Sequence, residues 1–463
     1  MQQPAADLLF AAAGHAATYL DSLGARPVDA ERGPSDALDA VDNELPDGPV
    51  APGLVLDELV AQVEPGITAM GSARYFGFVI GGALPVAIAA DWMVSTWDQN
   101  VGLSSPTPAA AAVEDIAGAW LLELLRLPPD ASFAFVTGCQ MAHVTALAAA
   151  RHRVLANSGW DVEQDGLIGA PPIRVLVGAE RHVTVDRALR FLGLGASCIE
   201  PVEVDARGAM DPDTLTRQLA AGGGPTVVCA QAGNVNTGAI DPLGAICDAG
   251  HAGDAWVHVD GAFGLWANAS PRLRHLLSGC ERADSWATDA HKWLNVPYDC
   301  GMAIVADRDA HRAAMSVSAS YLEQGASVRE PLDWTPEFSR RARSLPVYAV
   351  LRSLGRAGVA ELVDRLCACA DRFATQLDAV PGIDVLTHAL NQVLVRLDDD
   401  GAVTDQIVQE LQREGTCWTS ATTWRDQRCM RISVSNWRTT PDDVDRSVEA
   451  ITRIRNSVVH GTP

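Results

Sequence analysis

Lys292 is the side chain of this sequence with the clearest potential for covalent chemistry. It follows His291 in the stretch DAHKW, a turn-like segment just ahead of the apolar run GMAIV. Taken alone, the two residues are best interpreted as a solvated surface pair, because lysine is costly to bury. A lysine amine with a lowered pKa, however, attacks carbonyl groups and forms a Schiff base. Other parts of the chain have to decide between these two interpretations.

Three further segments place polar groups directly after apolar runs. Gly138, Cys139 and Gln140 follow FAFVT and precede a helical pattern. Free amides at a helix start bind phosphate, although an ordinary strand–turn–helix looks the same. His182 follows IRVLVGAER and is either a structural histidine or a flat ring that stacks on a planar ligand. Asp260 ends WVHVD, and a buried carboxylate there needs a cap, a salt bridge or a buried cation.

Together these groups match the needs of an aldehyde cofactor. Such a cofactor requires a lysine, an acid for a ring nitrogen, an anion cradle for a phosphate and a stacking group. The small residues Gly261 and Ala262, which follow Asp260, would let a flat ring approach closely. The joint occurrence of all four groups favours a functional interpretation of Lys292 over the surface pair.

Alternating patterns indicate how these groups are brought together. From about residue 130, short apolar runs alternate with helical patterns, which predicts a mostly parallel sheet with helices on both faces. Ligands bind beyond the carboxyl ends of such strands. After about residue 345, a long helical pattern leads to two half-buried strands and a closing helix. We therefore predict an N-terminal helical arm (1–105), a large α/β domain (106–345) and a small α+β domain (346–463).

Composition narrows the class of protein. The 463 residues carry a formal charge of −23, from 35 basic and 58 acidic side chains, which disfavours nucleic acid and anionic membranes as partners. No apolar run of about 18 residues is long enough for a membrane span, and the N-terminal segment lacks the basic region of a signal peptide. The ten cysteines are scattered without a metal-type spacing. They predict a cytoplasmic protein with reduced thiols and no metal site.

The sequence resembles the pyridoxal-phosphate (PLP) enzymes of fold type I, and more narrowly the group II decarboxylases of aromatic amino acids and glutamate. The stretches HVDGAFG and DAHKW…DCG carry the resemblance, with 32 residues from Asp260 to Lys292 (292 − 260). AGNVNTGAID, RYFGFVIGG, SSPTPAAAAVE, SYLEQG and SRRARSLPVYAVLRSLG resemble further segments of that family. The resemblance implies an aspartate aminotransferase-like fold, with a mostly parallel seven-stranded sheet and a small C-terminal α+β domain.

The same resemblance implies roles at the cofactor. Lys292 would hold PLP as an internal aldimine, and Asp260 would pair with the pyridine nitrogen. His182 and Ala262 would cover the two ring faces. The groups expected to hold the phosphate are the amides of Gly138, Cys139 and Gln140, with His291 and Ser285. Where the family often has a threonine for the ring hydroxyl, this chain has Val235, which leaves that role to Asn234 or Asn236.

The implied reaction is decarboxylation of an L-amino acid to an amine and CO2, through an external aldimine and a quinonoid. Tyr321 would return a proton to the carbon that loses CO2. Tyr75 and Phe76 would line the substrate pocket, and Arg343 or Arg431 would meet a carboxylate. His143 replaces an asparagine that is frequent in the family, and it either reaches the pocket or packs in the core.

Three alternatives stay open at this point. The same scaffold supports oxidative decarboxylation–deamination to an aldehyde when the loop proton donor is lost, and Tyr321 argues against this. An aminotransferase would use Arg431 for the α-carboxylate. A PLP-binding protein without turnover would keep Lys292 and Asp260. The resemblance also implies a homodimer with active sites at the interface, and it leaves the identity of the amino acid undetermined.

Overall fold

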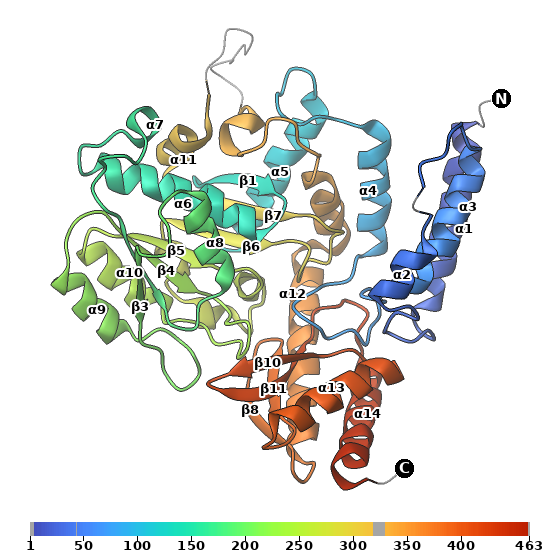
Figure 1. Cartoon of the computed structure of the whole chain (residues 1–463). Helices are drawn as coiled ribbons and strands as arrows, with labels where there is room; N and C mark the ends of the chain where they lie inside the picture. Colours follow the sequence, from blue (N-terminus) through green and yellow to red (C-terminus); the bar gives the residue numbers. More distant parts are fainter. Residues whose placement is uncertain (1–3, 43, 318–328, 462–463) are drawn as a thin grey trace.

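The computed structural model of the chain describes residues 4–42, 44–317 and 329–461 (Figure 1). Its N-terminal part is helical, and α1 to α3 lie together at one side of the molecule, next to α4. These elements are α1 (Ala5–Ser22), α2 (Pro34–Ala40), α3 (Pro52–Val63), η1 (Glu64–Gly66), α4 (Pro85–Trp97) and α5 (Pro108–Leu124). Proline occupies the first turn of α2 to α5, where its missing N–H would have no helical partner anyway.

A seven-stranded sheet forms the centre of the molecule. Its spatial order is β1-β7-β6-β5-β4-β2-β3, and only β7 runs antiparallel to its neighbours. The strands are β1 (Ser132–Val136), β2 (Arg174–Gly178), β3 (Ile199–Val202), β4 (Thr226–Gln231), β5 (Trp256–Asp260), β6 (Ser285–Asp289) and β7 (Gly301–Val305). The predicted mostly parallel seven-stranded sheet is confirmed.

Helices cover this sheet, as the alternating patterns require. They are α6 (Cys139–Ala156), α7 (Val162–Asp165), α8 (Val183–Phe191), α9 (Pro212–Ala221), α10 (Leu243–Ala252) and α11 (Arg308–Met315). Short 3-10 turns follow β5 and precede the last domain: η2 (Gly264–Ala269), η3 (Arg274–Leu277), η4 (Cys280–Arg282) and η5 (Pro331–Trp334). The strands β1, β4, β5, β6 and β7 are buried along their whole length, which explains their continuous apolar runs.

The C-terminal part is a second, antiparallel sheet of order β10-β11-β9-β8, packed with helices. Its elements are α12 (Ser344–Asp378), β8 (Asp384–Ala389), β9 (Gln392–Arg396), α13 (Gly401–Glu414), β10 (Ser420–Trp424), β11 (Gln427–Ser433) and α14 (Pro441–His460). The predicted α+β character is confirmed. The helix α12 runs across the predicted boundary at residues 345 and 346 and is kinked at Gly355 (φ 61°). The three predicted domain ranges themselves remain a prediction.

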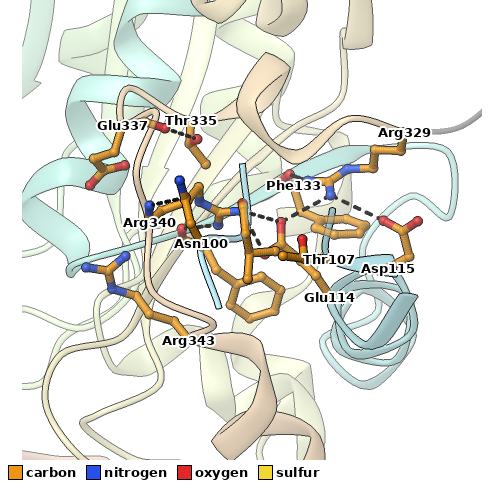
Figure 2. A network of polar contacts seen from close by, with 12 residues as sticks. Asn100, Thr107, Glu114, Asp115, Phe133, Arg329, Thr335, Glu337, Arg340 and Arg343 are labelled. Carbon is orange, nitrogen blue, oxygen red and sulfur yellow. Dashed lines mark hydrogen bonds and ion pairs between the residues drawn. The ribbon is translucent and has the colours of Figure 1, made fainter. Parts of the chain in front are cut away.

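A buried cluster of charges ties the segment 329–343 to α5 and β1 (Figure 2). Glu114 accepts hydrogen bonds from Arg340 Nη1 at 2.9 and 3.0 Å, and from Arg329 Nη1 at 3.1 Å. Arg340 also donates to the carbonyl oxygens of Val101 and Phe135, so two of its guanidinium nitrogens are bonded to protein oxygens. Within the described residues, no helix is long and apolar enough to cross a membrane.

Candidate active site

A cavity of about 280 Å³ opens at the carboxyl ends of the parallel strands. The loops after β1, β2, β4, β5 and β6 all contribute to its wall, as expected for an α/β sheet. The sequence-predicted site residues that line it are Gly138, Cys139, Gln140, His182, Asp260, Ala262, His291 and Lys292. Four segments that are distant in the sequence therefore converge on one cavity.

Lys292 lies in the turn after β6 and makes an ion pair inside the cavity. Its Nζ is 3.0 Å from Oδ2 of Asp289, the last residue of β6. Burial alone would lower the pKa of Lys292, but the surrounding negative charges, with Asp289 the largest contributor and Asp260 a further one, together hold that pKa above its ordinary value. Without ligand, Lys292 is therefore a cation, and it has to lose a proton before its amine can attack a carbonyl group.

Asp289 also contacts the start of α6. Its Oδ1 accepts a hydrogen bond of 2.6 Å from the backbone N–H of Cys139, the first residue of that helix. His291 Nε2 lies 3.4 Å from the same oxygen. The sequence reasoning missed Asp289, although a carboxylate at the end of a buried strand, three residues before Lys292, was a usable signal. Its charge lies where the resemblance places the phosphate.

Asp260 ends β5 and is 5% exposed. Its Oδ2 is 3.6 Å from His143 Nε2, and its Oδ1 accepts a hydrogen bond of 3.2 Å from the backbone N–H of Ala262. Burial would raise the pKa of Asp260, but His143, His182 and Lys292 hold it well below the usual range. The carboxylate is therefore ionised, as a partner of a cationic ring nitrogen must be.

His182 precedes α8 and is fixed by Thr184. Its Nδ1 accepts from the backbone N–H of Thr184 and lies 2.8 Å from the Thr184 hydroxyl, so the ring caps the helix. Burial lowers the pKa of His182, and the ring is neutral at pH 7. His182 is therefore a structural cap that also lines the cavity, and its stacking on a planar ligand remains a prediction.

The donor set fits a pyridoxal phosphate. A lysine amine, an ionised carboxylate, a flat imidazole and the N-terminus of an 18-residue helix face one cavity. Gly301 lets β7 approach this helix start closely, since a Cβ there would lie 2.5 Å from the Cα of Gly138. The Oε1 atom of Gln140 is buried without a partner in the described structure, and it borders the same space.

Four other predicted residues lie away from the cavity. Ser285 begins β6 and not its carboxyl end, and its Oγ contacts Trp256 and His258. Asn234 is buried in the turn after β4, where its Oδ1 caps the backbone of residues 236 and 237. Tyr75 stacks on Trp418, and Phe76 packs against Phe373 in the core. The reason is a pairing of the segment around residue 75 with the small sheet: Phe76 N–H donates to Trp418 and Phe76 C=O accepts from Ser433.

The remaining predictions have mixed outcomes. His143 is fully buried behind Asp260 and does not line the cavity. Arg343 donates to Asp299 at 2.9 Å and does not line the cavity. Arg431, on β11, donates at 3.3 Å to the carbonyl oxygen of Val235, which does line the cavity. Tyr321 lies outside the described residues. Sequence reasoning did not select Val79, Thr184 and Phe263, which are part of the wall.

Comparison with known proteins agrees with this site. Residues 34–395 match the model of the pyridoxal-dependent decarboxylase conserved domain. The chain belongs to the pyridoxal-dependent decarboxylase family. Its cofactor is pyridoxal phosphate.

Similar proteins include decarboxylases and an aldehyde synthase. The chain is 27% identical to the aromatic-L-amino-acid decarboxylase of Bacillus atrophaeus, covering 92% of this chain and 90% of that protein. It is also 27% identical to the phenylacetaldehyde synthase of Arabidopsis thaliana, over 80% and 78% of the two chains. Among solved structures, Oryza sativa TDC with PLP and tryptamine superimposes with a TM-score of 0.92 at 25% identity, covering 99% of each chain. The predicted fold type is thereby confirmed.

Proposed function

We propose that this decarboxylase-family member releases CO2 from an L-amino acid and forms the corresponding amine. The observation that carries the proposal is the convergence of Lys292 and Asp260, at the ends of the neighbouring strands β6 and β5, on one cavity. Pyridoxal phosphate supplies an electron sink for the bond that breaks. The chain itself has to bind the cofactor, orient the substrate and control protons.

The residues divide this work between them. Lys292 would attach the cofactor through Nζ and accept or give the proton of the substrate amine. Asp260 would keep the proton on the pyridine nitrogen, because its carboxylate stays ionised. His182 and Ala262 would hold the ring, so that the carboxylate bond of the substrate stands across the ring plane. Tyr321 would return a proton to the carbon that has lost CO2.

Arg431 supports a carboxylate-bearing substrate. It is 8% exposed, no carboxylate pairs with it in the described part of the chain, and its Nε is buried without a partner. Burial lowers the pKa of Arg431 to about 10, and the group still carries its charge at pH 7. A buried guanidinium of this kind is a receptor for an anionic group.

A homodimer fits the surface of the N-terminal helices. Large apolar side chains are exposed on α1, α3 and α4, with Phe10 at 77%, Leu59 at 54% and Trp97 at 53%. A second subunit that covers them would remove this apolar surface from water. The ten cysteines are all free thiols, which supports the cytoplasmic location that the sequence predicts.

The decisive experiment is a product analysis with a panel of L-amino acids. Purified protein and PLP are incubated with each acid, and CO2, amine, aldehyde and keto acid are measured by mass spectrometry. Amine and CO2 in equal amounts, absent in Lys292→Ala, are the expected result. Aldehyde with ammonia would indicate the oxidative reaction, which the similarity to phenylacetaldehyde synthase keeps as the second candidate. Keto acid without CO2 would establish an aminotransferase and overturn the proposal.

A further inference from the structure

A line of buried polar side chains runs away from the cavity behind Asp260. Trp256, His258 and Asp260 alternate along β5 and therefore face the same side of the sheet. The helix α6 packs on this side and brings His143 next to Asp260. Ser285 stands opposite His258 in the register of β5 and β6. Of these five side chains, only Asp260 has a role in the reaction proposed above.

The hydrogen bonds of this line have only one consistent direction. The indole N–H of Trp256 can only donate, and it donates to Ser285 Oγ at 2.8 Å. In the described structure the other partner of Ser285 Oγ is Nδ1 of His258, at 2.9 Å, so the serine proton goes to that nitrogen. His258 then carries its own proton on Nε2 and donates it to Nδ1 of His143, also at 2.9 Å. His143 in turn carries its proton on Nε2, the atom that lies 3.4 Å from Cys139 Sγ and 3.6 Å from Asp260 Oδ2.

We propose that Trp256, Ser285, His258 and His143 form a polarised relay of neutral groups that holds Asp260 ionised beneath the ring nitrogen of the cofactor. His143 and His258 are positioning residues in this relay, since they act on the cofactor only through Asp260. Each imidazole has its Nε2–H directed toward the carboxylate, and the fixed donor at the far end prevents both rings from reversing. Hydrogen bonds aligned in one direction strengthen each other in a low-dielectric interior.

The electrostatics of the surroundings are consistent with neutral rings. Burial lowers the pKa of His258 to about 3, so His258 does not carry a charge at pH 7. Burial raises the pKa of the Cys139 thiol, whose Sγ lies 3.4 Å from His143 Nε2, so this group is uncharged as well. The titratable groups that interact with Asp260 from the elements packed around it are Cys139, His143, His182, Cys229, Asp241, His258 and Lys292. Of these groups, His143 Nε2 lies 3.6 Å from Oδ2 of Asp260, and the Cys139 thiol donates to Oδ1 at 3.9 Å.

The inference rests on the proposed placement of the ring nitrogen at Asp260, but its first test does not. In protein labelled with ¹⁵N-histidine, the chemical shifts of the ring nitrogens distinguish the two neutral tautomers and the cation. We expect His143 and His258 to be neutral Nε2–H tautomers in the folded protein. In Ser285→Ala, Nδ1 of His258 loses its donor, and we expect the pattern of that ring to change. A cationic His143, or Nδ1–H tautomers in the wild-type protein, would overturn the relay.

The second test reads the cofactor directly. The protein is loaded with PLP that carries ¹⁵N in the pyridine ring, and the nitrogen shift is recorded against pH. His143→Leu removes the imidazole N–H that lies 3.6 Å from Asp260, so the proton affinity of the carboxylate rises and the proton shared with the ring nitrogen should move toward the carboxylate. The ¹⁵N shift should then move toward that of an unprotonated pyridine, by about a tenfold change in the ratio of the two forms. His143→Gln retains an N–H donor and should restore most of the shift. His311→Leu is the matched control, because His311 is equally buried and bonded to Ser132 Oγ and to the carbonyl oxygen of Trp334, without contact to Asp260.

Each outcome bears on the relay. An unchanged nitrogen titration in His143→Leu, or an equal change in His311→Leu, would contradict the positioning role. Failure of the wild-type protein to bind PLP would sink the proposed function, while the histidine tautomers would still report on the relay. Far-UV circular dichroism and the thermal midpoint of each variant show whether it has folded. If His143→Leu does not fold, the ring-nitrogen measurement is made on His143→Gln instead.

Discussion

The Nζ of Lys292 lies 3.0 Å from Oδ2 of Asp289, while Oδ1 of the same carboxylate accepts a hydrogen bond from the amide of Cys139. One side chain thus neutralises the lysine and covers an amide of the helix start. Both groups are the ones that a pyridoxal phosphate has to engage, through its aldehyde and its phosphate. Asp289 is therefore expected to oppose the binding of the cofactor that Lys292 and α6 otherwise favour.

Asp289→Asn should tighten PLP binding and speed its covalent attachment at neutral pH. The variant removes a negative charge next to the phosphate, for which we expect roughly a tenfold lower Kd. It also removes the charge that raises the pKa of Lys292, so more of the amine is neutral at pH 7. Fluorescence titration gives the Kd, and the visible absorbance of the lysine adduct gives the rate.

A remote variant with the same change of charge provides the control for Asp289→Asn. Asp248 is exposed and pairs with Arg282 on the protein surface, so Asp248→Asn should leave both quantities unchanged. Weaker PLP binding in Asp289→Asn would mean that the carboxylate orients Lys292 more than it repels the phosphate.

The stability of the protein should fall as the pH is lowered from about 6.5 toward 3. Burial lowers the pKa of His258 and of His311 to about 3 in the folded chain, whereas an unfolded histidine has a pKa of about 6.5. Within this window the unfolded state binds more protons than the folded state, and stability therefore rises with pH. Each buried histidine contributes a slope of order 1 kcal/mol per pH unit.

Urea unfolding at several pH values measures this slope. His311→Gln, outside the relay, should flatten the pH dependence by about the share of one histidine. A slope that is identical in the variant and the wild-type protein would show that His311 is protonated in the folded state, against its burial between Ser132 and Trp334.

The parts of the site that sequence predicts well are those set by local order. Lys292, Asp260, His182 and the start of α6 were all found because apolar runs mark strands and because strand ends meet at one sheet edge. The same reasoning also placed Ser285 at this edge of the sheet, among the groups expected to hold the phosphate. It stands four residues before the end of β6, which is about 13 Å along an extended chain, so it belongs to the opposite edge.

Contacts between distant segments could not be read from the sequence. Tyr75 and Phe76 resemble pocket residues by motif, but their backbone pairs with residues near Trp418 and Ser433, which turns the side chains into the core. His143 is one helical position among many, and only the packing of α6 on β5 brings it to Asp260. Such pairings depend on the whole fold, and no local pattern encodes them.

Glu114→Gln should destabilise the chain strongly. Glu114 is fully buried and accepts hydrogen bonds from both Arg340 and Arg329 (Figure 2). The substitution therefore removes the negative charge that these two guanidinium groups share. Removing one partner of a buried ion pair costs about 3–5 kcal/mol. The free energy of unfolding in urea measures the loss.

The exposed pair of Glu410 and Arg413 on α13 serves as the reference for this variant. Glu410→Gln should change the free energy of unfolding by less than about 0.5 kcal/mol, because an exposed ion pair is screened by water. Equal losses in the two variants would show that burial of the Glu114 cluster contributes nothing beyond an ordinary surface pair.

Arg431→Lys should weaken the binding of the substrate more than the binding of the cofactor. The guanidinium of Arg431 is buried beside the cavity wall at Val235, and a lysine ammonium cannot reproduce its planar, two-pronged contact with a carboxylate. Loss of a hydrogen bond to a charged group is worth about 1.5–3 kcal/mol, so the KM for the amino acid should rise about 10- to 150-fold while the Kd for PLP stays constant. Arg428→Lys is the matched control, because Arg428 lies three residues earlier on β11 and pairs with Asp405. A rise in the PLP Kd with an unchanged KM would instead place Arg431 at the cofactor, and its missing partner would then be the phosphate.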